Sequence, residues 1–401
     1  MKRVIITAAA ASLVLAGAVS ATGAPSSPAH GNARVCAAPA AGQAACDAHV
    51  VTYASNGKAL ATTSWNNNGY SPAQLAGVYK PGPSTAVVAI VDAYANPNAA
   101  GDLDAYRLQF GLGSANLTQI NQTGGDISSV SGNSGWGQEE MLDLEMVSAM
   151  CPACPILYVG ANSASFNDLA AAVTTAASYT VNGQKAKAIS NSYGGNEFSS
   201  EGSSTYSGPY NLKGVAVTVS SGDSGYGPEF PATAQDVIAV GGTSLKLNST
   251  GGRSSETAWS SAGSGCSAYV SKPSWQHDSG CSRRTESDIS AVADPYTGVA
   301  VYDSYGSSSG ANWYVFGGTS VAAPLVGTLY ATYGVPVGAN GYAVENAWST
   351  AGRAGLYDVT SGSNGRCTSR RSTSGAYLCT AGSGYDGPTG NGTPNGSSAP
   401  F

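Results

Sequence analysis

The chain has 401 residues and a formal net charge of −6, and charged residues make up only 10% of it. This length supports a core of ordinary size, and 42% hydrophobic residues with 53 glycines indicate a globular chain rather than a disordered one. Beyond Lys2 and Arg3, basic residues cluster only as the pairs 283–284 and 370–371, so neither nucleic acid nor an anionic membrane surface is an expected partner. Few charges also limit charge build-up when carboxylates protonate, which suits an acidic medium.

The amino-terminal segment has the pattern of a secretory signal. Lys2 and Arg3 precede an apolar run over residues 4–19, which is shorter than the ~20 residues needed to span a membrane. We therefore expect a signal peptide over 1–24 and a secreted, extracellular protein that has no membrane contact after cleavage. A short, cysteine-containing leader rich in Ala, Pro, Gly and Asn follows over 25–68.

Eight cysteines in a secreted chain favour disulfides. They fall into local pairs, and we predict the bridges Cys36–Cys46, Cys151–Cys154, Cys266–Cys281 and Cys367–Cys379. The spacing of Cys151 and Cys154 also fits a redox pair or half a zinc site. No second such pair or flanking histidine completes a metal site, so a structural disulfide is the favoured interpretation.

From residue 69 onward, apolar runs typical of strands alternate with helical stretches. The strands are predicted over 85–91, 155–160, 186–190, 215–220 and 237–240, and the helices over 99–110, 138–150 and 166–179. Such alternation predicts an α/β fold in three layers, with a central, mainly parallel sheet flanked by helices. Functional groups should then gather beyond the carboxyl ends of the strands. A Gly/Ser/Pro-rich tail is expected over 387–401.

The helix over 138–150 places two acids on an apolar face. At 100° per residue, Glu139 and Asp143 lie about 40° apart within the arc of leucine, methionine and valine residues. Glu140 and Glu145 fall on the flanks of this arc, where they should reach water. Two buried carboxylates at this spacing repel each other and lose hydration, which raises a pKa and lets the pair share a proton. That property suits acid–base catalysis. The alternative interpretation is a helix whose acids are all solvated and have no catalytic role.

Two further acids follow predicted strands. Asp223 lies in a glycine turn after the strand 215–220, where a protonated carboxyl could donate a hydrogen bond to an oxyanion at low pH. A loop or capping Asp would look the same. Asp92 follows the strand 85–91 and is either a further carboxylate supporting the pair or a turn residue.

Ser320 is the candidate nucleophile. It lies in Gly-Gly-Thr-Ser-Val-Ala-Ala-Pro, where a tight glycine turn opens a helix. A serine at a helix start lies near free N–H groups and the positive end of the helix dipole, which favours a reaction that forms an oxyanion. A capping serine is the alternative, but the glycine pair and the early proline favour a nucleophile.

The three histidines are poorly placed to serve as the base for Ser320. His30 and His49 lie in the leader, and His277 lies in a polar loop, so none is expected at a strand end or on a core helix. A Ser-His-Asp hydrolase is therefore disfavoured, with His277 as its only candidate base.

Together these segments resemble the sedolisin family, the serine-carboxyl peptidases, over roughly residues 69–401. The resemblance rests on the motifs around Ser320, on Glu-Glu-Met-Leu-Asp-Leu-Glu from residue 139 and on Ser-Ser-Gly-Asp-Ser-Gly around Asp223. Further matches begin at Glu229, in Glu-Phe-Pro-Ala, and at Ser287, in Ser-Asp-Ile-Ser. The resemblance implies a subtilisin-like fold and a sedolisin-like peptidase domain, here over 69–386, that hydrolyses polypeptide substrates at acidic pH.

The resemblance also implies roles for the candidate residues. Ser320 would attack the scissile carbonyl, and Glu139 would take and return the proton. Asp143 would hold Glu139, and a protonated Asp223 would complete the oxyanion hole. The segment Ser192, Tyr193 and Gly194 would pair with the substrate backbone as an added strand, although family members commonly have Trp in place of the tyrosine.

The family carries one calcium ion near its carboxyl terminus. The positions that match its ligands are Asp358, Val359, Gly382, Gly384 and Asp386. Two carboxylates with backbone carbonyls in glycine turns suit a hard cation, although the residues alone would be interpreted as a loop.

One departure concerns the leader. Typical sedolisins carry a large folded propeptide, whereas the leader expected here is too short to form a sizeable domain. Either the enzyme folds unaided or the leader with Cys36 and Cys46 serves as a small cap. A monomer is expected. Two other functions stay open: a subtilisin-type hydrolase that uses His277, and an inactive, protease-derived secreted binding protein.

Overall fold

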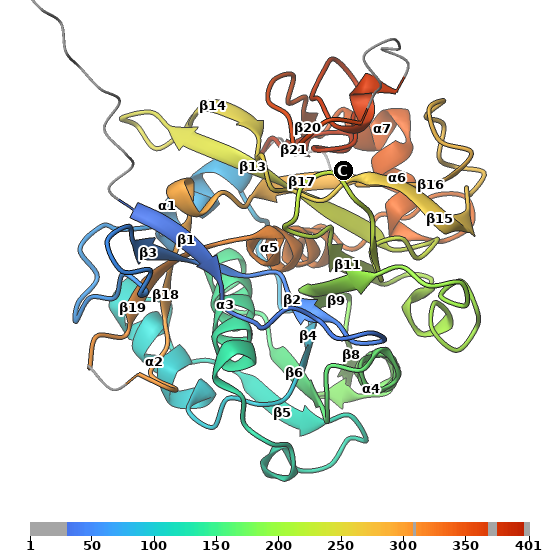
Figure 1. The fold of residues 1–401 in the computed structure, drawn as a ribbon. Helices are drawn as coiled ribbons and strands as arrows, with labels where there is room; N and C mark the ends of the chain where they lie inside the picture. Colours follow the sequence, from blue (N-terminus) through green and yellow to red (C-terminus); the bar gives the residue numbers. More distant parts are fainter. Residues whose placement is uncertain (1–29, 308–309, 368–374, 397–401) are drawn as a thin grey trace, which may run out of the picture.

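A mainly parallel sheet forms the middle of the molecule (Figure 1). The computed structural model describes residues 30–307, 310–367 and 375–396, so the expected signal peptide lies outside the described residues. The strands of this sheet are β4 (Val88–Ala93), β5 (Leu117–Asn121), β6 (Ile156–Ala161), β9 (Ala188–Asn191), β11 (Ala216–Ser220), β13 (Ile238–Leu247), β14 (Arg253–Ala258) and β17 (Ile289–Val292). Their order is β14-β13-β11-β9-β4-β6-β5, with β17 also beside β13. Only the β13–β14 pair is antiparallel.

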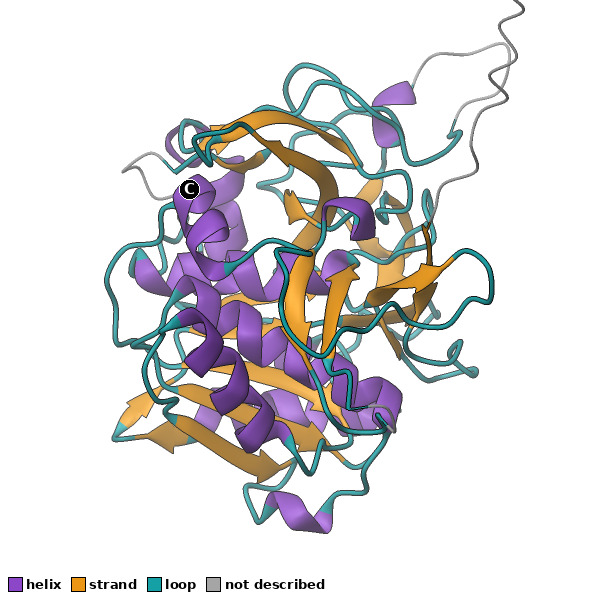
Figure 2. Ribbon diagram, turned by 90° about the vertical axis from the view of Figure 1, so that its left-hand side faces the viewer, coloured by secondary structure: helices purple, strands orange, loops and turns teal. Residues whose placement is uncertain are grey.

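Helices cover both faces of this sheet, and Figure 2 shows the layers from the side. They are α1 (Pro72–Tyr79), α2 (Ala99–Phe110), α3 (Ser134–Met150), α4 (Phe166–Ser178), α5 (Thr319–Thr332), α6 (Ala343–Trp348) and α7 (Thr350–Arg353). On one face α3 and α5 pack against each other and on the strands, and on the other face α4 packs on β4 and β6. An apolar core fills each interface. The predicted three-layer α/β fold is therefore confirmed.

Polar caps explain where two of these helices begin. The side chain of Asn133 accepts a hydrogen bond from the Trp136 N–H, so α3 starts four residues earlier than the predicted helix. The side chain of Ser165 accepts one from the Asp168 N–H at the start of α4. The strand ends lie within three residues of the predicted ones, apart from the end of β13, which extends to Leu247.

The leader belongs to the fold from residue 30 onward. Its strands β1 (His30–Arg34) and β3 (His49–Tyr53) join β19 (Trp313–Gly317) and β18 (Val299–Tyr302) in an antiparallel sheet of order β1-β3-β19-β18. Its strand β2 (Ala45–Cys46) lies on β10 (Tyr193–Asn196), which also pairs with β12 (Glu229–Phe230). Smaller two-stranded sheets join β7 (Thr180–Val181) to β8 (Gln184–Lys185), β15 (Gly265–Ser271) to β16 (Arg283–Glu286), and β20 (Leu356–Tyr357) to β21 (Thr393–Pro394).

The expected tail over 387–401 is packed into the fold as far as the structure describes it. The Ser290 N–H donates to the carbonyl of Gly392, and Thr393 is fully buried in β21. Gly390 has a φ of +61°, and a Cβ there would lie 2.2 Å from the backbone of Asp288. The glycines that suggested a loose tail therefore allow close contact with the chain beneath it.

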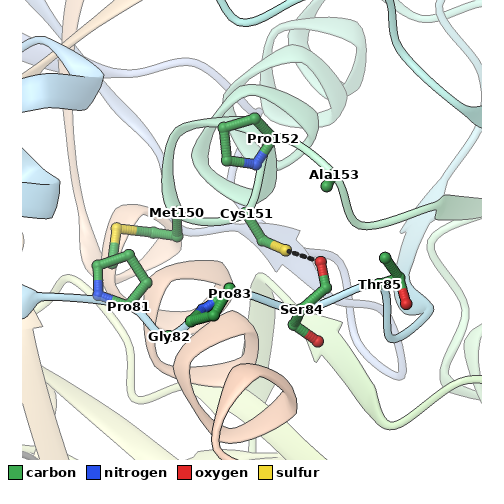
Figure 3. Close-up of a pocket in the computed structure, with 9 residues that line it drawn as sticks. All are labelled: Pro81, Gly82, Pro83, Ser84, Thr85, Met150, Cys151, Pro152 and Ala153. Carbon is green, nitrogen blue, oxygen red and sulfur yellow. Dashed lines mark hydrogen bonds between the residues drawn. The ribbon is translucent and has the colours of Figure 1, made fainter.

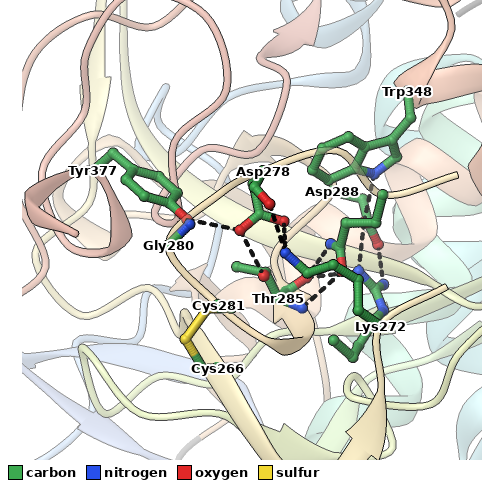
Figure 4. A network of polar contacts seen from close by, with 11 residues as sticks. Cys266, Lys272, Asp278, Gly280, Cys281, Thr285, Asp288, Trp348 and Tyr377 are labelled. Atoms are coloured by element: carbon green, nitrogen blue, oxygen red, sulfur yellow. Dashed lines mark hydrogen bonds and ion pairs between the residues drawn. A yellow bond between two sulfur atoms is a disulfide. The ribbon is translucent and has the colours of Figure 1, made fainter. Parts of the chain in front are cut away.

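All four predicted disulfides are present. Cys266–Cys281 lies beside a polar network in which Asp278 accepts hydrogen bonds from Lys272, Thr285 and Tyr377 (Figure 4). Among the described residues no helix is long and apolar enough to cross a membrane.

Candidate active site

Ser320 is the second residue of α5, and the chain enters this helix through a position that requires glycine. Gly318 has a φ of +102°, and a Cβ there would lie 2.0 Å from the carbonyl oxygen of Asp47. The first N–H groups of α5 have no partner inside the helix, which leaves them free to bind an oxygen. The Ser320 hydroxyl donates to the carbonyl oxygen of Ser192 at 3.3 Å, and Ser320 is 0% exposed.

Glu139 and Asp143 lie one turn apart on α3 and are both buried. The Ser192 hydroxyl lies 2.8 Å from each carboxyl oxygen of Asp143. Neither carboxyl oxygen of Glu139 has a partner at good hydrogen-bond geometry among the described residues. Burial and then the charge of Asp143 raise the pKa of Glu139 well above its ordinary value. The Ser320 hydroxyl, although directed at the Ser192 carbonyl, lies near enough to Glu139 to oppose that rise in pKa.

A third carboxyl, Asp92, lies beside this pair. It is fully buried in β4, and neither of its oxygens has a hydrogen-bond partner within the part of the chain that the structure describes. Burial raises the pKa of Asp92 to about 8, and its charge in turn raises the pKa values of Glu139 and Asp143. The three carboxyls therefore titrate together, and each proton lost makes the next loss harder. Of the two interpretations of Asp92, the structure favours the carboxylate that supports the pair.

Asp223 reaches the start of α5 from the loop after β11. Its Oδ1 accepts hydrogen bonds from the N–H and the hydroxyl of Thr319, both at 2.8 Å. Burial and then the nearby charge of Asp47 raise the pKa of Asp223 well above its ordinary value. The carboxyl is therefore protonated over a wider pH range than a solvent-exposed Asp.

The segment Ser192–Tyr193–Gly194 forms the edge expected to bind a substrate backbone. The backbone of Tyr193 and Gly194 pairs with the leader strand β2. The side chain of Tyr193 does not line this edge, because it is buried and its hydroxyl bonds Asn191 and Tyr210. The Tyr193 side chain is therefore not positioned to contact a substrate.

The prediction that Glu140 and Glu145 reach water was wrong, because both are buried. Glu140 accepts hydrogen bonds from the Asn96 N–H and from Gln119, and Glu145 accepts from the Tyr302 N–H. The reason is that α3 is surrounded by α1, α2, α5, β4 and β18, so it has no solvent face along most of its length.

The histidines are arranged differently from the prediction in one case. His49 begins β3, opposite Gly317, and its Nε2 lies 3.5 Å from Oδ2 of Asp223. Burial lowers the pKa of His49 to about 4, so this ring is neutral over most of the pH range. His277 is exposed in the loop between β15 and β16, and no contact connects it to Ser320. The sequence reasoning missed His49 because strand pairing with a distant segment places it.

The same reasoning missed two other leader residues, Arg34 and Asp47. Asp47 is fully buried, accepts a hydrogen bond from Ser220 at 2.7 Å and pairs with Arg34 at 3.3 Å. Glu229, which is not part of the leader, lies near Asp47 and Arg34. Burial raises the pKa of Glu229 to about 8, and the charge of Asp47 adds to this rise while that of Arg34 opposes it. Only the predicted Cys36–Cys46 bridge marked this part of the leader as ordered.

The candidate calcium positions come together in part. Asp386 is buried and accepts from the Gly382 N–H at 3.0 Å, while Asp358 accepts from the Gly384 N–H at 2.9 Å. Val359, next to Asp358, is buried. Burial raises the pKa of Asp386 to about 7, and the charge of Asp358 contributes to the rise. Among the described residues no group of three His, Cys, Asp or Glu side chains is placed to hold a metal.

A cavity of about 760 Å³ lies away from these groups, between residues 81–85 and the end of α3 (Figure 3). Pro81, Pro83, Met150 and Pro152 line it, and Cys151 contacts the carbonyl of Ser84. It offers no acid, base or nucleophile beyond the Ser84 and Thr85 hydroxyls, so it is not the candidate site.

These groups and the fold define a subtilisin-like protein with a buried serine and carboxyl cluster. The family model for the subtilase family matches residues 130–333, which include the four residues assigned to catalysis by resemblance. The chain is 30% identical to sedolisin of Pseudomonas sp. (strain 101) over 372 residues, which is 81% of this chain and 60% of that protein. It also matches the structure of Pseudomonas sedolisin complexed with two molecules of pseudo-iodotyrostatin, at 28% identity and a TM-score of 0.67, over 82% of this chain and 96% of the other.

The chain therefore belongs to the subtilase family, and it is a sedolisin-type member with the subtilisin-like fold. It spans about 60% of the length of the curated relative that it matches.

Proposed function

We propose that this protein is a secreted serine-carboxyl peptidase that hydrolyses polypeptides at acidic pH through an acyl-enzyme on Ser320. The observation that carries the proposal is the meeting of Ser320 with Glu139 of the buried pair Glu139 and Asp143. Among the described residues the Ser320 hydroxyl donates to the Ser192 carbonyl and to no histidine. The four disulfides support an extracellular location. The proposed mechanism requires no residue from a second copy of the chain, and a monomer is proposed.

Glu139 supplies the base in this mechanism. The carboxyl cluster loses its first proton at a lower pH than the later ones, because each loss adds a like charge. The singly charged cluster accepts the proton of Ser320 as the hydroxyl attacks, and it returns a proton to the leaving nitrogen. Asp143 and Asp92 hold that charge near Glu139, and the Ser192 hydroxyl fixes Asp143.

Asp223 supplies a hydrogen-bond donor for the oxyanion, together with the N–H of Ser320. A carboxyl donates only while it is protonated, so this function is lost as the pH rises through its raised pKa. That requirement gives the proposal its acidic pH range.

The carboxylates of Asp358 and Asp386 are proposed to hold one structural calcium ion with the backbone oxygens of Val359, Gly382 and Gly384. The two acids fit a hard cation in kind, since the charge of Asp358 raises the pKa of Asp386 and a dication would favour the charged form of both. Addition of a chelator should lower the melting temperature of the protein, and excess calcium should restore it.

A phosphonate ester with a peptide arm tests the mechanism directly, because it labels an activated serine. After incubation at acidic pH, peptide mapping should find the label on Ser320 and none in Glu139→Gln. A folded protein that takes up no label between pH 2 and 9 would instead support the inactive binding protein.

A further inference from the structure

The leader lies in the groove that a substrate should occupy. β2 pairs antiparallel with β10, with Cys46 opposite Tyr193 and Ala45 opposite Gly194. This is the edge at which a substrate backbone is expected to add as a strand. Ser320 is 0% exposed in this arrangement, so no external polypeptide can reach it.

The register of the leader places one peptide bond at the nucleophile. The Asp47 N–H donates to the carbonyl of Ser192 at 3.2 Å, and the Ser320 N–H donates to the carbonyl oxygen of Asp47 at 3.2 Å. A Cβ on Gly318 would lie 2.0 Å from that carbonyl oxygen and 2.6 Å from Oδ2 of Asp223. The Asp47 carbonyl therefore points into the space between the two proposed oxyanion donors.

The chain is also held on the far side of this bond. The Val35 N–H donates to the carbonyl of Ala48 at 3.0 Å, and β3 pairs with β19 from His49 onward. The leader is thus extended and fixed by main-chain hydrogen bonds on both sides of Asp47–Ala48. Fixing a substrate in this way removes much of the entropic cost of reaching the transition state.

The side chain of Asp47 is buried and held by polar groups. Ser220 donates to it at 2.7 Å, and Arg34 pairs with it at 3.3 Å. Arg34 belongs to the leader, so the leader supplies the cation that holds its own acid. The disulfide between Cys36 and Cys46 joins the two segments that carry Arg34 and Asp47, because these residues lie just outside the loop that it closes.

We propose that Asp47–Ala48 is a processing site: the leader blocks the groove as a bound strand until Ser320 of the same molecule cuts this bond. The proposal rests on the proposed function. Ser320 Oγ bonds to the carbonyl carbon of Asp47 while its proton passes to Glu139. The C–N bond then breaks, and Glu139 gives the proton to the nitrogen of Ala48. Water adds to the ester, Glu139 relays one water proton to Ser320 Oγ, and Asp47 leaves with a terminal carboxyl group.

The position of the cut decides what is released. Cys36 and Cys46 both precede it, so their disulfide does not tether the amino-terminal product. Non-covalent contacts then retain that product, among them the pairing of β1 with β3 and of β2 with β10, and Ala48 becomes the new amino terminus. Release then opens the groove along β10.

The test uses the full chain, purified near neutral pH and shifted to pH 4. Intact mass and amino-terminal sequencing should show a new terminus at Ala48, formed at a rate independent of protein concentration. Ser320→Ala should keep its leader. Asp47→Pro, which lacks the N–H that bonds Ser192, should slow this cut at least tenfold. Ala37→Pro, at an exposed position of the same disulfide loop, should process normally.

Hydrolysis of an added unfolded protein separates the two proposals. If the wild type degrades that protein while Asp47–Ala48 stays intact, or is cut elsewhere in the leader, the processing site is overturned and the peptidase function stands. A cut at Asp47–Ala48 that also occurs in Ser320→Ala overturns it too, because another protease is then responsible. If neither the added protein nor the leader is cut, both proposals fail.

Discussion

The carboxyl group of Asp223 receives both of its hydrogen bonds from Thr319 on the same oxygen. The N–H and the hydroxyl of Thr319 each lie 2.8 Å from Oδ1. Oδ2 is buried, has no hydrogen bond among the residues that the structure describes and lies 3.5 Å from Nε2 of His49. A proton on this carboxyl therefore belongs on Oδ2, which faces the space in front of Gly318. The geometry is that of a donor held ready for an oxyanion.

Replacing Asp223 by Asn tests whether that proton sets the pH range. The amide can still accept from Thr319 and donate from the other side, but it donates at every pH. We expect Asp223→Asn to keep measurable activity and to shift the alkaline limb of its kcat profile to higher pH. Asp223→Ala should lose roughly 10²–10³ in kcat, as for other lost oxyanion donors. Equal losses in both variants, with no shift, would contradict this role.

Glu139→Gln should abolish the base. The expected loss in kcat is on the order of 10²–10⁴, the usual contribution of general acid–base catalysis. Glu140→Gln is the matched control, since Glu140 is equally buried on the same helix but bonds Asn96 and Gln119. The assignment is wrong if the control loses as much activity while both proteins remain folded by circular dichroism.

Ser192→Ala removes the donor that holds Asp143. The Ser192 hydroxyl lowers the pKa of Asp143, so its loss should raise that pKa further. The carboxyl cluster then keeps its proton to higher pH, and the acid limb of the kcat profile should move upward. A loss of activity without any movement of this limb would indicate a structural role only.

Stability should fall as the pH rises from acid to neutral. A carboxyl with a raised pKa binds its proton more tightly in the folded state, so its contribution is complete below the unfolded pKa of about 4. For Asp92 it is lost as the pH rises through the folded value of about 8. Loss of a few kcal/mol would lower the melting temperature by roughly 5–10 °C.

The control for this trend is Asp92→Asn, which carries no charge at any pH. Melting curves recorded from pH 4 to 8 should show a smaller fall for the variant than for the wild type. A wild-type melting temperature that rises over this range would show that the buried carboxyls are not protonated in the folded protein.

The sequence was sufficient to predict the sheet, the main helices and the acids that meet Ser320, because local patterns encode them. The 3.6-residue period placed Glu139 and Asp143 on one side of α3. The same period failed for Glu140 and Glu145, since it cannot tell that other elements cover every face of a helix. The position of the leader also escaped prediction, because it depends on the pairing of β2 with β10, about 150 residues away.

Hydrolysis of an unfolded protein from pH 2 to 9, after incubation at acidic pH, tests the central claim most directly. Wild-type protein is compared with Ser320→Ala, and both are checked for folding. The account predicts a bell-shaped profile with its maximum at acidic pH and no activity in the variant. Activity that rises steadily to pH 9, or that persists in Ser320→Ala, would contradict it.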